Sequence, residues 1–484
     1  MTKHLKMRLL ATGMIAIGLA GCSGRGSDSV VSSGGNDAVF DKFDGDIEQN
    51  VTLHILENDT AKSLGYLDEL LSDFNAAYAD KGIKAVDANI DQYTDLAQDG
   101  PAGYGPDLIY QANDMIMKNV AGHHILPLPT EKIEAESELP EEAAKAFRGT
   151  INGNTYTFGV PVNIQAPFLF YRKDMLPEGC DKNGNGVPDM IESWNNLYSY
   201  SQAIKAQGGT KRGYMKALYD VYFSSGFLFS YGGYVFGDNG TDPNDIGFNK
   251  GEAYKGAREI RQLASAMDKT CSDTSINTTC YSKLAQGEFF ATMTTPDVKN
   301  NFINEMANQY ETTEGLSKND ALQKAEDNLV IADLPKLPSS GDLTEDSPTL
   351  IDMKTMGGIN GYAISSYTKA PKACLAFLNF ATSYDMIMKR SQMMGIAPCR
   401  DDAVKEAGGL SGRLFSRLTK GDIYLMPSIT QVAQIWTPAE TLNKDLAMDP
   451  YRPASEQKYT TDAALQKGLD KVVSDIAAAI STLQ

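Results

Sequence analysis

The chain has 484 residues, of which 62 are acidic and 44 are basic, so its formal net charge is −18. It is longer than one ordinary domain core, and its 42% of hydrophobic residues is typical of globular proteins, so two or more folded domains are expected. The acidic balance disfavours nucleic acid as a partner, because phosphate binding needs clustered Lys and Arg. It also disfavours electrostatic docking on an anionic membrane.

The first 21 residues have the pattern of an export signal. A basic start precedes an apolar run over residues 9–19, which is too short to span a bilayer as a helix. The run ends in Leu19-Ala20-Gly21-Cys22, which resembles the lipobox of bacterial lipoproteins. This resemblance implies that residues 1–21 are a lipoprotein signal peptide and that Cys22 is lipidated, which would anchor an exported protein on the periplasmic or cell-surface face of a membrane. A plain secretory signal is the alternative.

Residues 22–49 are expected to form a flexible tether. Residues 23–36 are mostly Ser, Gly, Asp and Asn without an apolar period, so this stretch cannot bury enough surface to order itself. A flexible chain of this length would hold a folded body roughly 30 Å from the bilayer. No later stretch is long and apolar enough to predict a transmembrane helix.

The body of the chain is predicted to be α/β. A β-prone run over residues 51–56 precedes apolar residues at helical spacing over 64–78, and further strands are predicted over 83–90 and 106–110. This alternation is typical of parallel βαβ units. Further helices are expected over residues 194–206, 253–267, 370–383 and 463–483. The order of elements predicts two α/β lobes.

One segment fits a specific metal-binding motif. Residues 181–192 read D-K-N-G-N-G-V-P-D-M-I-E and match the calcium-loop pattern D-x-[DN]-x-[DN]-G-x5-E throughout. The predicted oxygen ligands of Ca²⁺ are the side chains of Asp181, Asn183, Asn185, Asp189 and Glu192 and the carbonyl of Val187. Because no helix is predicted before the loop, we expect a structural clip of modest affinity and not a paired EF-hand sensor. A glycine- and asparagine-rich turn with chance acids is the alternative.

Export permits disulfides, and five cysteines remain besides Cys22. Cys271 and Cys280 bracket a short polar loop and are the easiest pair to close. Cys374 and Cys399 could form a second bridge, and other pairings stay open.

Common enzyme signatures are missing from the sequence. It contains no G-x-S-x-G, Walker A, H-E-x-x-H or C-x-x-C motif, so an esterase, a nucleotide enzyme or a metallopeptidase is not expected. With 62 acidic residues, a carboxylate pair that hydrolyses glycosides stays open as an alternative.

Several segments, taken in order, follow the pattern of one known family. They are P-D-L-I-Y-Q-A-N-D at 106–114, I-N-G-N-T-Y at 151–156 with G-V-P-V at 159–162, F-Y-R-K-D-M-L-P at 170–177, Y-F at 222–223, G-G-Y-V-F at 232–236, Q-G-E at 286–288 before Pro296, and K-G-D-I at 420–423 before Met426-Pro427 and Trp436. Each segment alone is weak evidence. Together, from about Val51 to the C-terminus, they resemble the maltose- and maltodextrin-binding proteins, which are family 1 extracellular solute-binding proteins of bacterial ABC importers.

The resemblance implies the type II periplasmic binding protein fold, in which two hinge-linked lobes enclose a ligand cleft. The N-terminal lobe would comprise residues 50–164 and 334–395, and the C-terminal lobe residues 165–333 and 396–484, with the calcium loop as an insertion. The chain would cross between the lobes near residues 163–166, 332–334 and 395–398. Such a protein is expected to act as a monomer without catalysis, closing on a sugar and delivering it to the permease of the importer.

Matching to the family also implies the ligand-binding residues. Aromatic rings stack on the C–H faces of sugars, and the platforms would be Trp436 and Tyr222. Hydroxyl groups would be bound at or near Asn58, Asp59, Asp114, Gln165 and Asp220. Four positions depart from the family: Gln111 and Asp297 replace stacking aromatics, Glu440 replaces Arg, and Gln165 replaces Glu. These departures weaken the maltodextrin assignment and leave another oligosaccharide open.

Two alternatives come from other functional classes. An extracytoplasmic glycan-active enzyme would need two acids roughly 5–10 Å apart across the cleft. A receptor that presents its closed form to a chemosensory protein would share the same fold. Within the class of importer receptors, a receptor for another polar or cationic solute, such as a polyamine, is a further alternative, consistent with Asp114, Asp220, Asp297 and Glu440 in one cleft.

Overall fold

The computed structural model describes residues 38–482 apart from residues 152, 274 and 408. The expected signal peptide, the lipidation site at Cys22 and the first part of the tether therefore lie outside the described residues. Within the described part of the chain, no helix is long and apolar enough to cross a bilayer.

The first described residues belong to the folded body. They form the 3-10 helix η1 (Ala38–Phe43), in which Phe40 and Phe43 are buried. The Nζ of Lys132 donates to the carbonyl of Phe43 at 2.9 Å, and the carboxylate of Glu48 accepts the backbone N–H of Ala373 at 2.8 Å. The prediction of a flexible tether is wrong for residues 38–49, because two phenylalanine side chains anchor this segment in the core.

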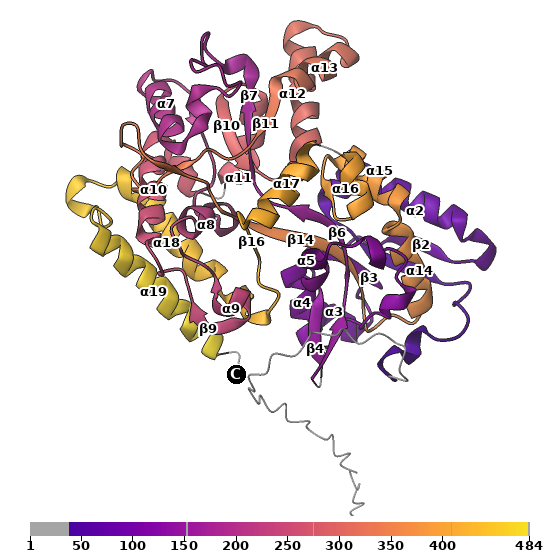
Figure 1. Ribbon diagram of the computed structural model, residues 1–484. Helices are drawn as coiled ribbons and strands as arrows, with labels where there is room; N and C mark the ends of the chain where they lie inside the picture. Colours follow the sequence, from indigo (N-terminus) through magenta and orange to yellow (C-terminus); the bar gives the residue numbers. More distant parts are fainter. Residues whose placement is uncertain (1–37, 152, 274, 408, 483–484) are drawn as a thin grey trace, which may run out of the picture.

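Two β-sheets covered by helices form two lobes, which lie side by side in Figure 1. The first sheet has the order β15-β6-β14-β3-β1-β2, with β16 paired to β14. Its strands are β1 (Thr52–Leu56), β2 (Lys84–Asp87), β3 (Leu108–Ala112), β6 (Val160–Gln165), β14 (Thr355–Ile364), β15 (Ala397–Pro398) and β16 (Ile423–Leu425). The second sheet has the order β11-β7-β10-β8, with β7 (Phe168–Arg172), β8 (Arg212–Tyr214), β10 (Phe289–Thr294) and β11 (Leu329–Ala332). The remaining strands are short: β4 (Arg148–Ile151), β5 (Asn154–Thr157), β9 (Asp242–Ile246), β12 (Leu337–Pro338) and β13 (Leu350–Ile351).

Helices cover both sheets (Figure 1). Those around the first sheet are α1 (Asp59–Ser63), α2 (Tyr66–Ala77), α3 (Leu96–Ala102), α4 (Asn113–Ala121), α5 (Glu141–Lys145), α14 (Pro371–Ala381), α15 (Tyr384–Met394) and α16 (Asp401–Ala407). Those around the second sheet are α6 (Asp189–Glu192), α7 (Trp194–Ala206), α8 (Val221–Phe229), α9 (Gly237–Gly240), α10 (Ala253–Ala266), α11 (Ser275–Ala285), α12 (Lys299–Glu314), α13 (Lys318–Asn328), α18 (Trp436–Met448) and α19 (Asp462–Ser481). One more helix, α17 (Gly409–Lys420), lies between the lobes.

The predicted elements are present. β1 pairs in parallel with both β2 and β3, as expected for βαβ units. The helices expected over 194–206, 253–267, 370–383 and 463–483 are α7, α10, α14 and α19, with ends that differ by two residues at most. These segments were predictable because each presents an apolar face to the protein core at helical spacing.

Strand β14 is the centre of the first sheet. It is buried along its whole length and pairs with β3 and β6 in antiparallel and with β16 in parallel fashion. At Gly361 a Cβ atom would lie 2.5 Å from the carbonyl oxygen of Val160, so only glycine permits this close approach of the strands. The tight packing makes β14 the central strand of the first sheet, paired with both β6 and β16, the two strands after which the chain leaves this lobe.

The first crossing lies where the resemblance places it, but the other two do not. β6 ends at Gln165 in the first sheet, and β7 begins at Phe168 in the second. After β11, however, residues 336–351 stay on the second lobe: the carbonyl of Lys336 accepts the N–H of Trp194, and that of Pro338 accepts the hydroxyl of Tyr231. The second crossing therefore comes shortly before β14, and not at residues 332–334.

The third crossing also comes later than expected. β15 pairs with β6, and β16 pairs with β14, so residues 396–425 add two strands to the first sheet before the chain enters α18. The boundary at residue 395 is therefore wrong, because backbone pairing holds both short strands in the first sheet. From α17, Arg417 donates to the carbonyl of Pro167 and to the hydroxyl of Thr355, so this one side chain bonds to two of the crossing segments.

The predicted disulfides are wrong. Within the described part of the chain, Cys180, Cys271, Cys280, Cys374 and Cys399 are all thiols. Cys374 lies on α14, with its Sγ 3.3 Å from the hydroxyl of Thr368, whereas Cys399 follows β15. Cys271 lies in a 3-10 helix and Cys280 in the middle of α11, so helical structure replaces the open polar loop that the pairing assumed.

Candidate functional site

A cavity of about 240 Å³ opens between the lobes, at the carboxyl ends of strands β1 and β3. Ligands commonly bind at this end of parallel strands in α/β proteins. The cavity is lined by Asn58, Thr60, Gln92, Tyr93, Tyr110, Gln111, Ala112, Met115 and Asn360 from the first lobe, by Gln165 at the first crossing, and by Asp297 from the second lobe. The structure thus brings together four of the predicted binding residues, namely Asn58, Gln111, Gln165 and Asp297.

Asn58 and Gln111 are held by the backbone around them. Asn58 is the N-cap of α1, and its Oδ1 accepts the N–H of Ala61 at 2.7 Å. Gln111 is only 5% exposed, and its Nε2 donates to the carbonyl oxygens of Gln92 and Thr94 at 2.9 and 3.1 Å. Its Oε1 has no hydrogen-bond partner among the residues that the structure describes. Gln111 therefore supports a turn at the cavity and keeps one acceptor unused.

Two buried carboxyl groups have a similar unused oxygen. Asp114, in the first turn of α4, is 8% exposed, and burial raises its pKa to about 6 against the opposing effects of local backbone N–H groups and of Lys118. Burial also raises the pKa of Asp297. The Oδ1 atoms of Asp114 and Asp297 have no partner in the described part of the chain. A buried acceptor without a donor costs free energy, so these atoms are suited to a ligand that brings donors.

Tyr222 connects the second lobe to the first crossing. It is in the first turn of α8, and its hydroxyl donates to the carbonyl of Gln165 at 3.3 Å. Its N–H donates to Oδ1 of Asp220, the N-cap of the same helix, at 3.1 Å. Burial raises the pKa of Tyr222, and the charges of Asp297, Asp220 and Asp114 raise it further. Tyr222 and Asp220 therefore lie together at the start of α8, beside a residue that lines the cavity.

Lys216 partly balances these acids, and the sequence analysis did not identify it. The side chain is buried, and its Nζ lies 3.5 Å from the centroid of the Phe223 ring. Burial lowers the pKa of Lys216, while Asp220 and Asp297 raise it. Lys216 had no visible signal in the sequence, because the burial of its side chain against Phe223 depends on tertiary packing.

Trp436 is the first residue of α18, and Glu440 lies one turn further along the same helix. Neither residue lines the 240 Å³ cavity. The indole is half-buried against the core of the second lobe, and Glu440 lies on the same face of the helix. Burial and the charge of Asp220 raise the pKa of Glu440. Asp59 starts α1 beside Asn58, and its charge acts on Tyr93.

Comparison with known proteins assigns the chain to a family. The model of the bacterial extracellular solute-binding proteins matches residues 58–387, which is more than half of the chain. The chain belongs to this family. The solute-binding protein is 26% identical over 449 residues to the maltodextrin-binding protein MdxE of Bacillus subtilis, and the match covers 91% of each chain.

One further sequence relative and one solved structure are similar to large parts of this chain. A maltooligosaccharide ABC transporter solute-binding lipoprotein of Streptococcus pneumoniae strain R6 is 22% identical over 305 residues, which is 62% of this chain and 63% of the relative. The crystal structure of MalX from Streptococcus pneumoniae in complex with maltopentaose covers 89% of this chain and all of its own, with a TM-score of 0.67 and 17% identity. The structural likeness confirms the expected two-lobed α/β fold.

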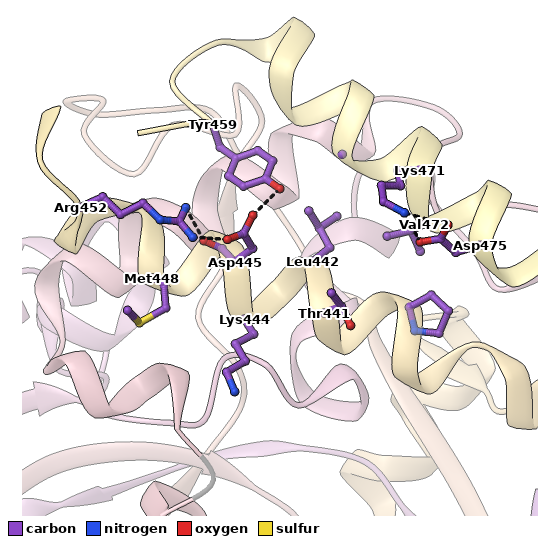
Figure 2. Close-up of a pocket in the computed structure, with 12 residues that line it drawn as sticks. Thr441, Leu442, Lys444, Asp445, Met448, Arg452, Tyr459, Lys471, Val472 and Asp475 are labelled. Atoms are coloured by element: carbon purple, nitrogen blue, oxygen red, sulfur yellow. Dashed lines mark hydrogen bonds and ion pairs between the residues drawn. The ribbon is translucent and has the colours of Figure 1, made fainter. Parts of the chain in front are cut away.

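A larger hollow of about 520 Å³ lies between α18 and α19 and contains none of the predicted site residues (Figure 2). Asp445 pairs there with Arg452 and accepts the hydroxyl of Tyr459 at 2.8 Å, while Lys471 pairs with Asp475 at 2.6 Å. The charged groups drawn in Figure 2 thus largely satisfy one another. The unused acceptors at the interlobe cavity make that cavity the better candidate, although it is smaller.

The loop over residues 181–192 is ordered by its own polar groups. The carboxylate of Asp181 accepts the N–H groups of Asn185 and Gly186, and the amides of Asn183 and Asn185 both donate to Oε1 of Glu192, at 2.7 and 2.5 Å. Gly186 has a φ of +84°, which glycine adopts without strain. Motif positions 1, 3, 5 and 12 thus converge, although no three His, Cys, Asp or Glu side chains in the described residues form a metal-binding group.

Proposed function

We propose that this solute-binding protein is the receptor of an ABC importer and binds an oligosaccharide of the maltodextrin class, without catalysis, between its lobes. The observation that carries the proposal is the pair of unused buried acceptors on the wall of the interlobe cavity, Oε1 of Gln111 and Oδ1 of Asp297. Oδ1 of Asp114 is a third unused acceptor, in the residue next to the lining residue Met115. A sugar carries several hydroxyl donors on one rigid ring and can satisfy such acceptors together. The names of the relatives, maltodextrin- and maltooligosaccharide-binding proteins, support this class of ligand.

The proposed mechanism is closure of the lobes on the sugar. Asn58 and Asp114 would bind hydroxyls from the first lobe, and Asp220 and Asp297 from the second, so a bound ligand bridges the two sheets. A ligand that bonds to both lobes stabilises the closed form by its difference in affinity for the two forms. The interlobe segments at Gln165 and before β14 would absorb the motion.

Export and lipid anchoring are part of the proposal. The lipobox-like Leu19-Ala20-Gly21-Cys22 and the similarity to a streptococcal solute-binding lipoprotein both support a lipid on Cys22. The anchored receptor would then deliver its ligand to the permease subunits of the importer in the same membrane.

The test is binding of maltotriose, measured by titration calorimetry, with Trp436→Ala as the diagnostic variant. We propose that the Trp436 indole stacks on a sugar ring, so truncation is expected to cost about 2 kcal/mol, or roughly thirtyfold in Kd. Trp436→Phe keeps an aromatic face and should lose much less. If the wild type binds neither maltotriose nor longer maltodextrins, the proposed function is wrong. If Trp436→Ala binds as tightly as the wild type, the role of Trp436 is wrong.

We also propose that the loop over residues 181–192 binds Ca²⁺ as a structural clip. The donor set is made of hard oxygen atoms, and rotation of the Asn183 and Asn185 amides by half a turn would present their Oδ1 atoms beside Glu192. Asp181, Asp189 and the carbonyl of Val187 would complete the ligands. The bound ion would fix the entrance to α7.

Calcium is therefore expected to raise the melting temperature. At a concentration a hundred times its Kd, a ligand of the native state stabilises it by about 2.7 kcal/mol, which corresponds to an increase of several degrees. Thermal melts at 1 mM CaCl₂ and 1 mM MgCl₂ measure the effect, and Asp181→Ala should abolish the response to calcium. An unchanged midpoint of the wild type in calcium would contradict the proposal.

A further inference from the structure

Tyr93 is an exposed aromatic residue on the wall of the interlobe cavity. It lies in the turn between β2 and α3, and 69% of its surface is exposed. The large hydrophobic residues with exposed side chains in the described chain are Tyr93, Tyr104, Val187, Leu350 and Tyr367. Of these, Tyr93 is the one that lines the cavity. An exposed aromatic ring at a concave site offers a large apolar face to a ligand at little cost in side-chain entropy.

The phenol of Tyr93 lies within the influence of both lobes. Burial of its surroundings raises its pKa, and the carboxylates of Asp59, Asp297 and Asp220 raise it further. Asp59 belongs to the first lobe, whereas Asp297 and Asp220 belong to the second. The ring is therefore open to solvent and stands on the wall of a cavity that Asp297 lines from the second lobe.

The turn that carries Tyr93 is fixed by side chains. The N–H of Tyr93 donates to Oδ1 of Asp91 at 2.7 Å, and Oε1 of Gln92 accepts the N–H of Asp59 at 3.2 Å. The carbonyls on either side of Tyr93, those of Gln92 and Thr94, both accept Nε2 of Gln111. One buried amide thus bonds to both neighbours of the exposed ring and holds the turn against β3.

These contacts give Gln111 a specific role. A glutamine cannot stack as an indole does, and its amide nitrogen is already used by the turn. We propose that Tyr93 is a stacking platform of the ligand cleft, which takes the C–H face of a pyranose ring, and that Gln111 is the positioning residue that holds it there. The inference rests on the proposed function, since it assigns a subsite within the same cleft. The hydroxyls of the stacked ring would point toward Asp59 and Asp297.

The test is maltotriose affinity, measured by calorimetry on the full chain, for Tyr93→Ala, Tyr93→Phe and the control Tyr104→Ala. Tyr104 is 82% exposed and does not line the cavity. Tyr93→Ala is expected to weaken binding at least about tenfold, and Tyr93→Phe less than about threefold, since the face of the ring is kept. Tyr104→Ala should leave binding unchanged, and the melting temperatures of all three unliganded variants should match the wild type.

The positioning role of Gln111 is tested by a double-mutant cycle. If Gln111→Ala acts through the turn of Tyr93, its loss of affinity is smaller in the Tyr93→Ala background than in the wild type, whereas a purely local or structural effect is additive. Full additivity overturns this role. Unchanged affinity of Tyr93→Ala, beside a wild type that binds, overturns the platform and leaves the proposed function intact. A wild type that binds no maltodextrin overturns both.

Discussion

Arg390→Ala is expected to lower the free energy of unfolding by about 3–5 kcal/mol, which is a large fraction of the stability of a typical domain. Arg390 is 1% exposed, and its two terminal nitrogens donate to both carboxylate oxygens of the fully buried Glu57, at 2.9 and 3.0 Å. The guanidinium also stacks 3.9 Å from the ring centroid of Tyr110. Removing it leaves a carboxylate without its cation in the core, which costs more than the pair contributes. Urea unfolding of the full chain, followed by circular dichroism, measures the loss.

The neighbouring Lys389 provides a matched control. Its side chain is 34% exposed and pairs with Glu69 and Asp73 at 3.1 and 2.7 Å on the surface. Lys389→Ala is expected to cost less than about 1 kcal/mol, because solvent screens exposed ion pairs. If Arg390→Ala and Lys389→Ala lowered the free energy of unfolding equally, burial of the ion pair would not explain the effect of Arg390→Ala.

The same ion pair connects stability to the site. Oε2 of Glu57 accepts the N–H of Asn58 at 3.1 Å, and the hydroxyl of Tyr362, from β14, donates to its Oε1 at 2.8 Å. The floor of the cavity is thus fixed by a buried network that joins β1, β14 and α15. Rigid elements under a site keep its side chains in place while the lobes move.

Local patterns predicted the elements that repeat an apolar period. The parallel strands β1, β2 and β3 and the helix α7 follow directly from such periods. β14 had no comparable signal, since its sequence T-M-G-G-I-N-G-Y-A-I is buried on both faces and rich in glycine. The later crossings between lobes, placed by the family resemblance, were misplaced for two reasons. Residues 336–351 bond to the second lobe, and the two- and three-residue strands β15 and β16 join the first sheet although they are too short to carry a sequence pattern.

The candidate site was predictable only where a resemblance reached individual residues. Asn58, Gln111, Gln165 and Asp297 come together at the cavity as the family match implies. Tyr93 could not be found in this way, because its exposure and its support by Gln111 are properties of the folded chain.

Asp114→Asn is expected to stabilise the protein above pH 6 while weakening its binding of sugar. Asp114 has a pKa of about 6 in the folded chain, compared with an ordinary value of 3.8, because burial raises it more than local backbone N–H groups and Lys118 lower it. The folded state therefore holds the proton more tightly than the unfolded state. The contribution of Asp114 to the free energy of unfolding is greatest below its pKa in the unfolded state. This contribution is lost as pH rises through the pKa of the folded state, and the total loss is about 3 kcal/mol.

Asparagine does not ionise, so Asp114→Asn avoids the cost of a buried carboxylate. Its free energy of unfolding should exceed that of the wild type by up to about 3 kcal/mol at pH 7–8 and by almost nothing below pH 4. Urea unfolding at intervals from pH 4 to pH 8 measures the difference. Asp402 provides a control of opposite sign, since hydrogen bonds from Arg400 hold its pKa below the ordinary value, so Asp402→Asn should destabilise the protein at neutral pH. A constant difference between Asp114→Asn and the wild type across this range would show that the carboxyl of Asp114 titrates normally. Stability gained together with lost affinity would identify Asp114 as a residue kept ionisable for its ligand at the expense of the fold.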